Sequence, residues 1–126
     1  MNFKRQKKLA DKYPGLFAGF GGDPMLTLMA FGCEIGDGWY DIFADLCEKL
    51  SKIEGVVLAQ VKEKFGQLRV YTYNGTDETE RLCEAALEQS THVCERCGAA
   101  GKLRGSGWYY TACDKHTKEE DLDVDA

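Results

Sequence analysis

The sequence lacks any apolar run near the roughly 18 residues of a membrane-spanning helix, so a membrane role is not expected. Its first residues are basic, but no apolar segment follows them, and we therefore expect no secretory signal and a cytoplasmic location. An excess of positive charge is also missing, since 16 Lys and Arg stand against 21 Asp and Glu for a net charge of −5. This balance argues against a strong nonspecific nucleic-acid binder.

Residues that would assemble a catalytic site are scarce. The chain has two histidines, which argues against a histidine-rich nuclease and leaves His92 as the one available base for a Cys33 nucleophile. The glycine-rich run at 19–22 is not followed by the Lys-Ser/Thr pair of a phosphate-binding P-loop. The sequence therefore favours a non-enzymatic role.

The residues that are present predict an α+β fold, with helices packed on a small antiparallel hairpin or sheet. With 126 residues and 44% hydrophobic residues, the chain can bury a core. Apolar spacing predicts helices over 2–13, from a cap at Asp37 to Gly55, and from Thr76 or Asp77 to Ser90. Alternation predicts a hairpin over 57–73 that turns near 64–66. Seven glycines mark 15–38 as a loop, in which Met25 to Phe31 forms a short strand or a helical turn.

The distribution of charge divides the chain. An acidic stretch over 13–91 lies between a basic start and a basic segment over 92–118, and the last eight residues carry five acids and no base. We interpret 1–91 as an α+β body, 92–118 as a zinc finger packed on the body, and 119–126 as an acidic tail that we expect to be disordered.

Three of the six cysteines and one histidine have the spacing of a zinc site. Cys94 and Cys97 form a C-x2-C pair, Cys113 and His116 form a C-x2-H pair, and fifteen residues separate the pairs. Four protein ligands predict one closed, structural Zn²⁺, because a catalytic ion keeps a position for water. His92 is an alternative to His116, although it lies only two residues before Cys94. In a reducing compartment a disulfide framework is not expected.

The segment around these pairs resembles a treble-clef zinc finger. A hairpin that turns at 105–107 follows the first pair, and helical residues from Thr117 to Val124 follow the second. A knuckle, a hairpin and a ligand pair that opens a helix occur in this order in treble clefs. The resemblance covers residues 92 to about 122.

Three strings carry a further resemblance: GDGWY at 36–40, KEKFGQLRVY at 62–71, and CERCG at 94–98 with GWYYTACDKH at 107–116. Together they resemble a family of small, functionally unassigned proteins of phages, prophages and bacteria. The resemblance implies a bacterial or phage cytoplasmic setting and supports the zinc site. It also suggests an accessory protein that modulates or inhibits a host defence factor.

Six cations are the candidate partner-binding residues. On the 57–73 hairpin, cations alternate with aromatic residues, an arrangement that can hold a single nucleic-acid strand or a nucleotide. A solvated outer face produces the same alternation and is the plainer interpretation. The six are Lys62, Lys64, Arg69, Arg96, Lys102 and Arg104.

Two functions follow from these observations. The first is a zinc-stabilised binding module that acts on a protein or, as the second choice, on a nucleic acid. The alternative is a binding protein or enzyme for a small, nucleotide-like ligand, which would use the glycine-rich loop and the hairpin cations. The closed metal site and the lack of a convincing catalytic set favour the first function. No oligomeric state is predicted.

Overall fold

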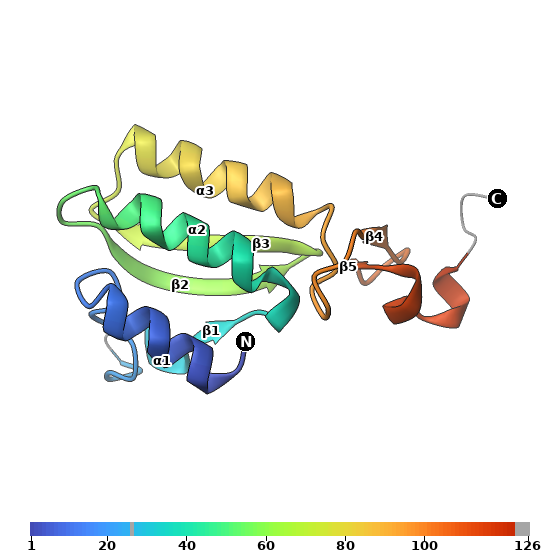
Figure 1. The fold of residues 1–126 in the computed structure, drawn as a ribbon, viewed down its shortest axis with the longest axis horizontal. Coiled ribbons are helices and arrows are strands. Elements are labelled where there is room, and N and C mark those ends of the chain that lie inside the picture. Colours follow the sequence, from blue (N-terminus) through green and yellow to red (C-terminus); the bar gives the residue numbers. More distant parts are fainter. Residues whose placement is uncertain (26, 123–126) are drawn as a thin grey trace.

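The computed structural model describes residues 1–25 and 27–122. Its described part has the predicted α+β fold, with three α-helices, a three-stranded sheet and a separate two-stranded hairpin (Figure 1). The helices are α1 (Phe3–Lys12), α2 (Tyr40–Ser51) and α3 (Asp77–Ser90). The strands are β1 (Cys33–Glu34), β2 (Val57–Lys64), β3 (Gln67–Tyr73), β4 (Lys102–Arg104) and β5 (Tyr110–Ala112).

The larger sheet has the order β1-β2-β3 and contains the predicted hairpin. β2 and β3 are antiparallel, and the pairing of Lys64 with Gln67 leaves a two-residue turn at Phe65 and Gly66. Both turn residues have positive φ, 55° and 78°, as a type I′ turn requires. β1 adds a short parallel strand on the other side of β2. The sequence analysis missed β1 because its two residues lie inside the glycine-rich loop.

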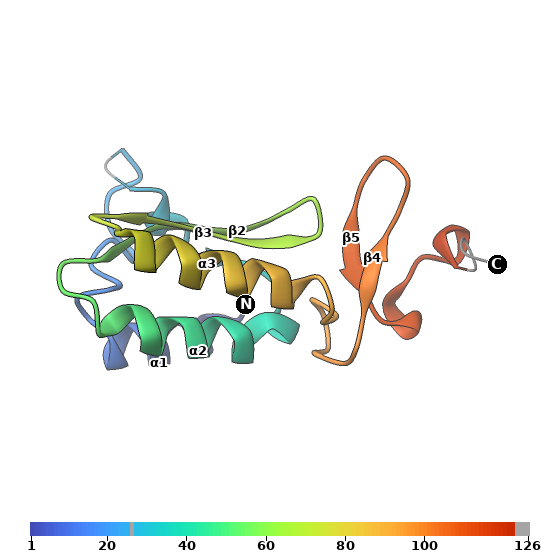
Figure 2. The ribbon, with the colours of Figure 1, turned by 90° about the horizontal axis from the view of Figure 1, so that it is seen from above.

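The helices lie on one side of the sheet. Figure 2 shows α1, α2 and α3 on the same side of β2 and β3, and within residues 1–25 and 27–122 no α-helix covers the opposite face. The core fills the space between the sheet and the helices. Its largest fully buried side chains include Trp39, Phe43 and Met29, which meet Leu58 and Leu68 of the sheet. No helix in the described ranges has the length and apolar character needed to cross a bilayer.

The start of the second predicted helix differs from expectation. Asp37 does not cap α2 but begins a 3-10 turn, Asp37–Trp39, that precedes the helix. The Asp37 carboxylate instead accepts a hydrogen bond from the backbone N–H of Asn2 at 2.9 Å and lies 3.9 Å from the Arg5 guanidinium. The helix ends at Ser51, and Gly55 turns the chain towards β2 with a φ of 83°.

The glycine-rich segment is less open than its composition suggests. Leu28–Phe31 form a 3-10 helix capped by the Thr27 hydroxyl, so the predicted helical turn is correct and the alternative strand is wrong. Gly32 has a φ of 77°, and a Cβ there would lie 2.4 Å from the Gln6 side-chain oxygen. That oxygen accepts a hydrogen bond from the backbone N–H of Cys33 at 2.8 Å. The positive φ and the close Gln6 side chain therefore account for this glycine.

The C-terminal segment contains the predicted hairpin but not the predicted helix. β4 and β5 pair through Leu103 and Thr111, and a 3-10 turn over Asp114–His116 follows. Thr117 is then extended, and a second 3-10 turn covers Glu119–Asp121. The helix predicted from Thr117 is therefore wrong over 117–122, and with it the element that would make the finger a treble clef. Val124 lies outside the described residues, as does the end of the predicted tail at 123–126.

Thr76 caps α3 through a reciprocal capping box with Thr79. We expect Thr76→Ala to lower the free energy of unfolding by about 1 kcal/mol, because the change leaves the Thr79 N–H without its side-chain acceptor. Thr76→Ser keeps the hydroxyl and is the matched control. Chemical denaturation of the three proteins measures the effect, and equal stabilities for the alanine and serine variants would contradict it.

Candidate metal centre

The first two ligands of the cluster come from a tight turn directly after α3. Gly98 donates its N–H to the Cys94 carbonyl at 2.9 Å, and Cys94 donates its N–H to the Ala99 carbonyl at 2.8 Å. Gly98 has a φ of 81°, a conformation that glycine adopts without a steric penalty. This closed turn brings the sulfurs of Cys94 and Cys97 to the same side of the backbone.

The other two ligands follow β5. Cys113 precedes the 3-10 turn that contains His116, and His116 donates its N–H to the Cys113 carbonyl at 3.1 Å. The Thr117 hydroxyl donates to the same carbonyl at 2.7 Å. Two hydrogen bonds therefore fix the turn that holds the thiol and the imidazole on one face.

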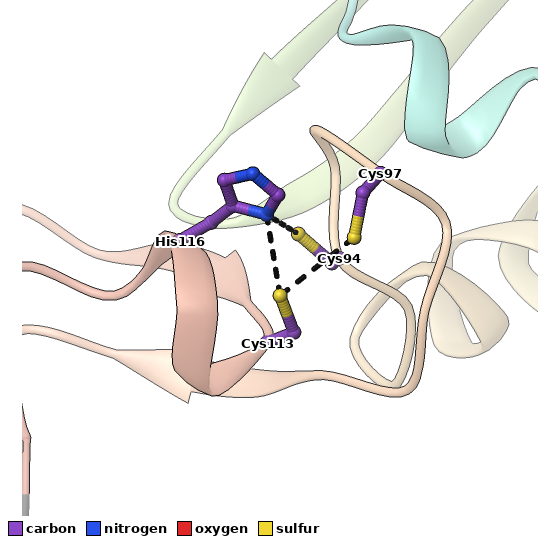
Figure 3. Close-up of side chains that lie close together, drawn as sticks. All are labelled: Cys94, Cys97, Cys113 and His116. Carbon is purple, nitrogen blue, oxygen red and sulfur yellow. Dashed lines mark hydrogen bonds between the residues drawn. The ribbon is translucent and has the colours of Figure 1, made fainter.

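The four ligand atoms lie close together, as the spacing predicts (Figure 3). The atoms of Cys94, Cys97, Cys113 and His116 all lie within 4.8 Å of one another. The Cys97 and Cys113 sulfurs are 3.7 Å apart. His116 Nδ1 lies 3.6 Å from the sulfur of Cys94 and 3.2 Å from that of Cys113. This group can hold a metal ion.

These distances match the edges of a tetrahedral site. Metal–sulfur bonds of about 2.3 Å and a metal–nitrogen bond of about 2.0 Å place two sulfurs about 3.8 Å apart, and a sulfur and a nitrogen about 3.6 Å apart. The pair Cys97–Cys113 and the pair Cys94–His116 have these separations. The pair Cys113–His116 is shorter, because the two residues share one turn.

The thiols of the first turn have opposite pKa shifts. The backbone N–H of Ala99 lowers the pKa of Cys97, but desolvation and the neighbouring Cys113 and Cys94 sulfurs outweigh it and raise that pKa. Cys94 favours the deprotonated thiol that a metal requires. Burial by itself would raise the pKa of Cys94, but the backbone N–H groups of Cys113, Cys97 and Arg96 outweigh it and lower the pKa to about 6. A thiolate at this position is a ready metal ligand at neutral pH. Cys94 is fully buried, whereas Cys97 is exposed, so the cluster lies at the surface of the finger.

The alternative ligand His92 lies away from the cluster. Its side chain is exposed, and Nε2 lies 3.5 Å from a carboxylate oxygen of Glu88 on α3. The structure therefore brings His116 to the cluster and not His92.

The first metal-binding turn is seated directly on the body. The Trp39 indole N–H donates to the Val93 carbonyl at 2.8 Å, and the Gly38 N–H donates to the Glu95 carbonyl at 2.7 Å. The Gly36 N–H donates to the Glu95 carboxylate at 2.9 Å. Burial of Glu95 raises the pKa of its carboxyl. Both sides of Cys94 are therefore hydrogen-bonded to the loop that precedes α2.

This contact needs glycine on the body side. A Cβ at Gly38 would lie 2.1 Å from the Cys94 carbonyl oxygen, and one at Gly36 would lie 2.3 Å from the Glu95 carbonyl oxygen. A second contact lies at the hairpin turn, where the Thr111 hydroxyl donates to the Gly66 carbonyl at 2.6 Å. A Cβ at Gly66 would lie 2.6 Å from Leu103.

The three strings noted in the sequence therefore meet at one junction. GDGWY supplies Gly36, Gly38 and Trp39, and KEKFGQLRVY supplies Gly66. The cysteine-containing strings supply the partners of the three glycines, and the partner of Trp39, Val93, directly precedes CERCG. Sequence reasoning missed this junction, although the glycines on either side of Asp37 and the glycine of the hairpin turn were its signal.

The predicted partner-binding cations have different environments. Lys62 and Arg69 lie opposite each other on β2 and β3, and Lys64 and Arg96 are exposed. The environment of Arg104 differs from the prediction of a partner-binding cation, because its side chain is only 7% exposed. Its guanidinium donates to Asp114 at 2.7 Å and to the Ala112 carbonyl at 3.3 Å. Arg104 therefore holds the hairpin to the second metal-binding turn and does not face a partner.

A scan against protein-family models, a search of curated proteins and a search of solved structures each found no match. The resemblance to phage and prophage proteins thus rests on the three strings and stays a prediction.

The close contact between Gly38 and the first metal-binding turn predicts a large loss of stability when one methyl group is added at Gly38. We expect Gly38→Ala to destabilise the protein by roughly 1–3 kcal/mol or more, because its Cβ would overlap backbone atoms of Cys94 and Glu95. Gly15→Ala is the matched control, since no atom lies within 4 Å of the corresponding Cβ. Denaturation curves measure both variants. Equal stabilities would show that the turn is not held against Gly38.

The six cysteines are expected to react in two groups. Burial raises the pKa of Cys33 to about 12 and that of Cys83 to about 11, and burial also raises the pKa of Cys47. These thiols stay protonated near pH 8 and react slowly. With a coloured disulfide reagent we expect three reactive thiols after metal is chelated, and all six only after denaturation. Six fast thiols on chelation would contradict this grouping.

Proposed function

We propose that the chain is a zinc-stabilised binding module. The observation that carries the proposal is the convergence of three cysteine sulfurs and one imidazole nitrogen within 4.8 Å. Thiolate and imidazole ligands at tetrahedral spacing suit Zn²⁺, whereas Mg²⁺ and Ca²⁺ prefer oxygen ligands. Four protein ligands leave no position for a water, and for this reason we assign the ion a structural role.

The finger needs such an ion because it has almost no apolar core. Among its described residues, 92–122, those that are buried are Cys94, Arg104, Thr111 and Ala112. Four mostly small or polar residues bury too little apolar area to offset the entropy of ordering the segment. A structural zinc ion contributes about 10–16 kcal/mol in comparable small fingers, and that energy is folding energy.

The binding role is supported by what this folded segment presents to solvent. Leu103, Trp108 and Tyr109 are exposed on the hairpin, and Phe65 is exposed at the adjacent turn of the body. Clustered exposed apolar side chains are a feature of interaction sites. The motif resemblance adds the proposal that the module acts in a bacterial cell, on a host factor, as a phage accessory protein.

The alternative of a small-molecule binder has less support. A cavity of about 440 Å³ lies between residues 12–16 and 51–57, away from the predicted hairpin cations. Gly36 and Gly38 of the glycine-rich loop are accounted for by close packing against backbone atoms, and Gly32 by its positive φ and the nearby Gln6 side chain, rather than by an open phosphate-binding loop. The loop and the cations thus do not form one site.

Native mass spectrometry with chelation tests the zinc proposal. We expect one zinc per chain, and we expect Cys97→Ser to lose the ion and unfold residues 92–120 while the body stays folded. Cys83→Ser is the matched control, because Cys83 lies on α3 outside the cluster, and it is expected to keep the zinc.

Hydrogen exchange locates the unfolded segment in the Cys97→Ser protein. Metal-free protein whose residues 92–120 stay protected in the presence of a chelator would overturn the proposal, and so would unchanged zinc content in the Cys97→Ser variant.

A further inference from the structure

We propose that the helix-free face of the β2–β3 hairpin binds single-stranded nucleic acid, with bases stacked on its aromatic side chains. This open face consists of Lys62, Lys64, Arg69, Tyr71 and Tyr73. An aromatic rim of Phe65, Trp108 and Tyr109 adjoins it at the finger. The proposal names a partner for the binding module and rests on that proposed function.

The register of the strands places the open face on one side. Gln67, Arg69, Tyr71 and Tyr73 alternate with Leu68 and Val70, which contribute to or pack against the core. Side chains at every second position of a strand point to the same face. Lys62 is paired with Arg69, and Lys64 with Gln67, so these lysines lie on the same face as the two tyrosines.

The charges on this face are unbalanced. Lys62 and Arg69 are direct cross-strand neighbours, and like charges in that position destabilise a sheet. Glu34 of β1 is paired with Lys62 and offsets one of the two charges. The Arg69 guanidinium donates from a terminal nitrogen to the Gln67 side-chain oxygen, and among the described residues its buried Nε has no hydrogen-bond partner. An anionic group that binds here would neutralise the remaining charge.

The aromatic side chains provide stacking surfaces beside these cations. Tyr71 and Tyr73 are 42% and 49% exposed, and they follow Arg69 along the same face of β3. Flat aromatic rings interleaved with cations hold single strands, because every base has a face that can stack. An acidic peptide would use the cations but would gain little from successive tyrosine rings.

The aromatic rim encloses a pocket for one planar group. Glu63, Lys64 and Phe65 of the body and 107–109 of the finger line a cavity of about 180 Å³. Sites for complete small-molecule ligands are usually about 300–1,000 Å³, so this cavity suits one base rather than a whole cofactor. Trp108 is 79% exposed and Phe65 is 59% exposed, so both rings are open to a planar group that enters the cavity.

The finger brings the rim to the open face. In Figure 2 the β4–β5 hairpin extends to the side of the sheet that the helices leave uncovered. The Thr111 hydroxyl, bonded to the Gly66 carbonyl, fixes this hairpin against the β2–β3 turn. The metal site therefore positions Trp108 and Tyr109 beside Lys64.

The overall charge sets the strength of binding. With a net charge of −5, the chain as a whole repels nucleic acid, and only the local cations attract it. Three phosphate contacts on a single strand predict a log–log salt dependence with a slope of about −2. We expect the protein to contact a short stretch of nucleic acid and to bind it weakly at high salt. We also expect the affinity to depend on the aromatic residues.

Fluorescence titration of the zinc-loaded full chain with oligothymidylate tests the proposal. Trp39 is fully buried, so quenching by a stacked base would report Trp108. We expect Trp108→Ala and Tyr71→Ser each to weaken binding by roughly 5- to 100-fold in anisotropy measurements with labelled oligothymidylate. We expect Lys64→Gln to reduce the magnitude of the salt slope by about 0.7. Each variant is used only if its zinc content and thermal stability are unchanged.

Lys8→Gln is the matched control, because Lys8 is an exposed cation on α1, on the other side of the sheet. Unchanged affinity in this variant, together with the losses above, supports the proposal.

Binding that falls with Lys8→Gln but not with Trp108→Ala would overturn it in favour of the basic helix. Equal binding of a polyglutamate peptide would show a general polyanion surface and overturn it too. A zinc-loaded, folded protein that does not bind oligothymidylate would refute this inference while leaving the zinc module intact.

Discussion

The backbone of residues 93–95 lies against Gly36, Gly38 and the Trp39 indole while the Cys94 side chain points into the metal cluster. Residues 93–95 therefore connect the body to the finger and also form half of the first metal-binding turn. Because carbonyl oxygens approach the glycines where a Cβ would lie, the contact has no room for other residues. The position of the finger depends on this contact.

The metal site and the body stabilise each other through that segment. The finger buries few apolar side chains, so its order depends on the contacts with the body and, under the zinc proposal, on the ion that the cluster would hold. The body gains in return, because Val93 and Glu95 satisfy the indole of its largest fully buried side chain and two backbone N–H groups of the 36–38 turn. The β4–β5 hairpin, held at Gly66, then extends the aromatic surface of the body.

Local patterns predicted most of the regular structure. Helices over α1 and α3, the β2–β3 hairpin and the β4–β5 hairpin all follow from spacing, caps and turn residues near in sequence. The predictions are wrong where contacts between residues far apart in the sequence determine the local structure. Asp37 binds the N-terminal segment instead of capping α2, and β1 exists only because β2 lies beside it. Residues 117–122 have helical composition but form turns, and the Tyr110 hydroxyl donates to Asp121 across them.

The sequence by itself determined the candidate metal ligands, because two ligand pairs at short fixed spacing can reach one ion whatever the rest of the fold does. It also determined the alternation that places cations and tyrosines on one strand face. Only the tertiary structure decided that His92 stays outside the cluster, that Arg104 is buried, and that three separate strings form one junction. Those outcomes depend on contacts between residues far apart in the chain, and neither spacing nor composition encodes such distances.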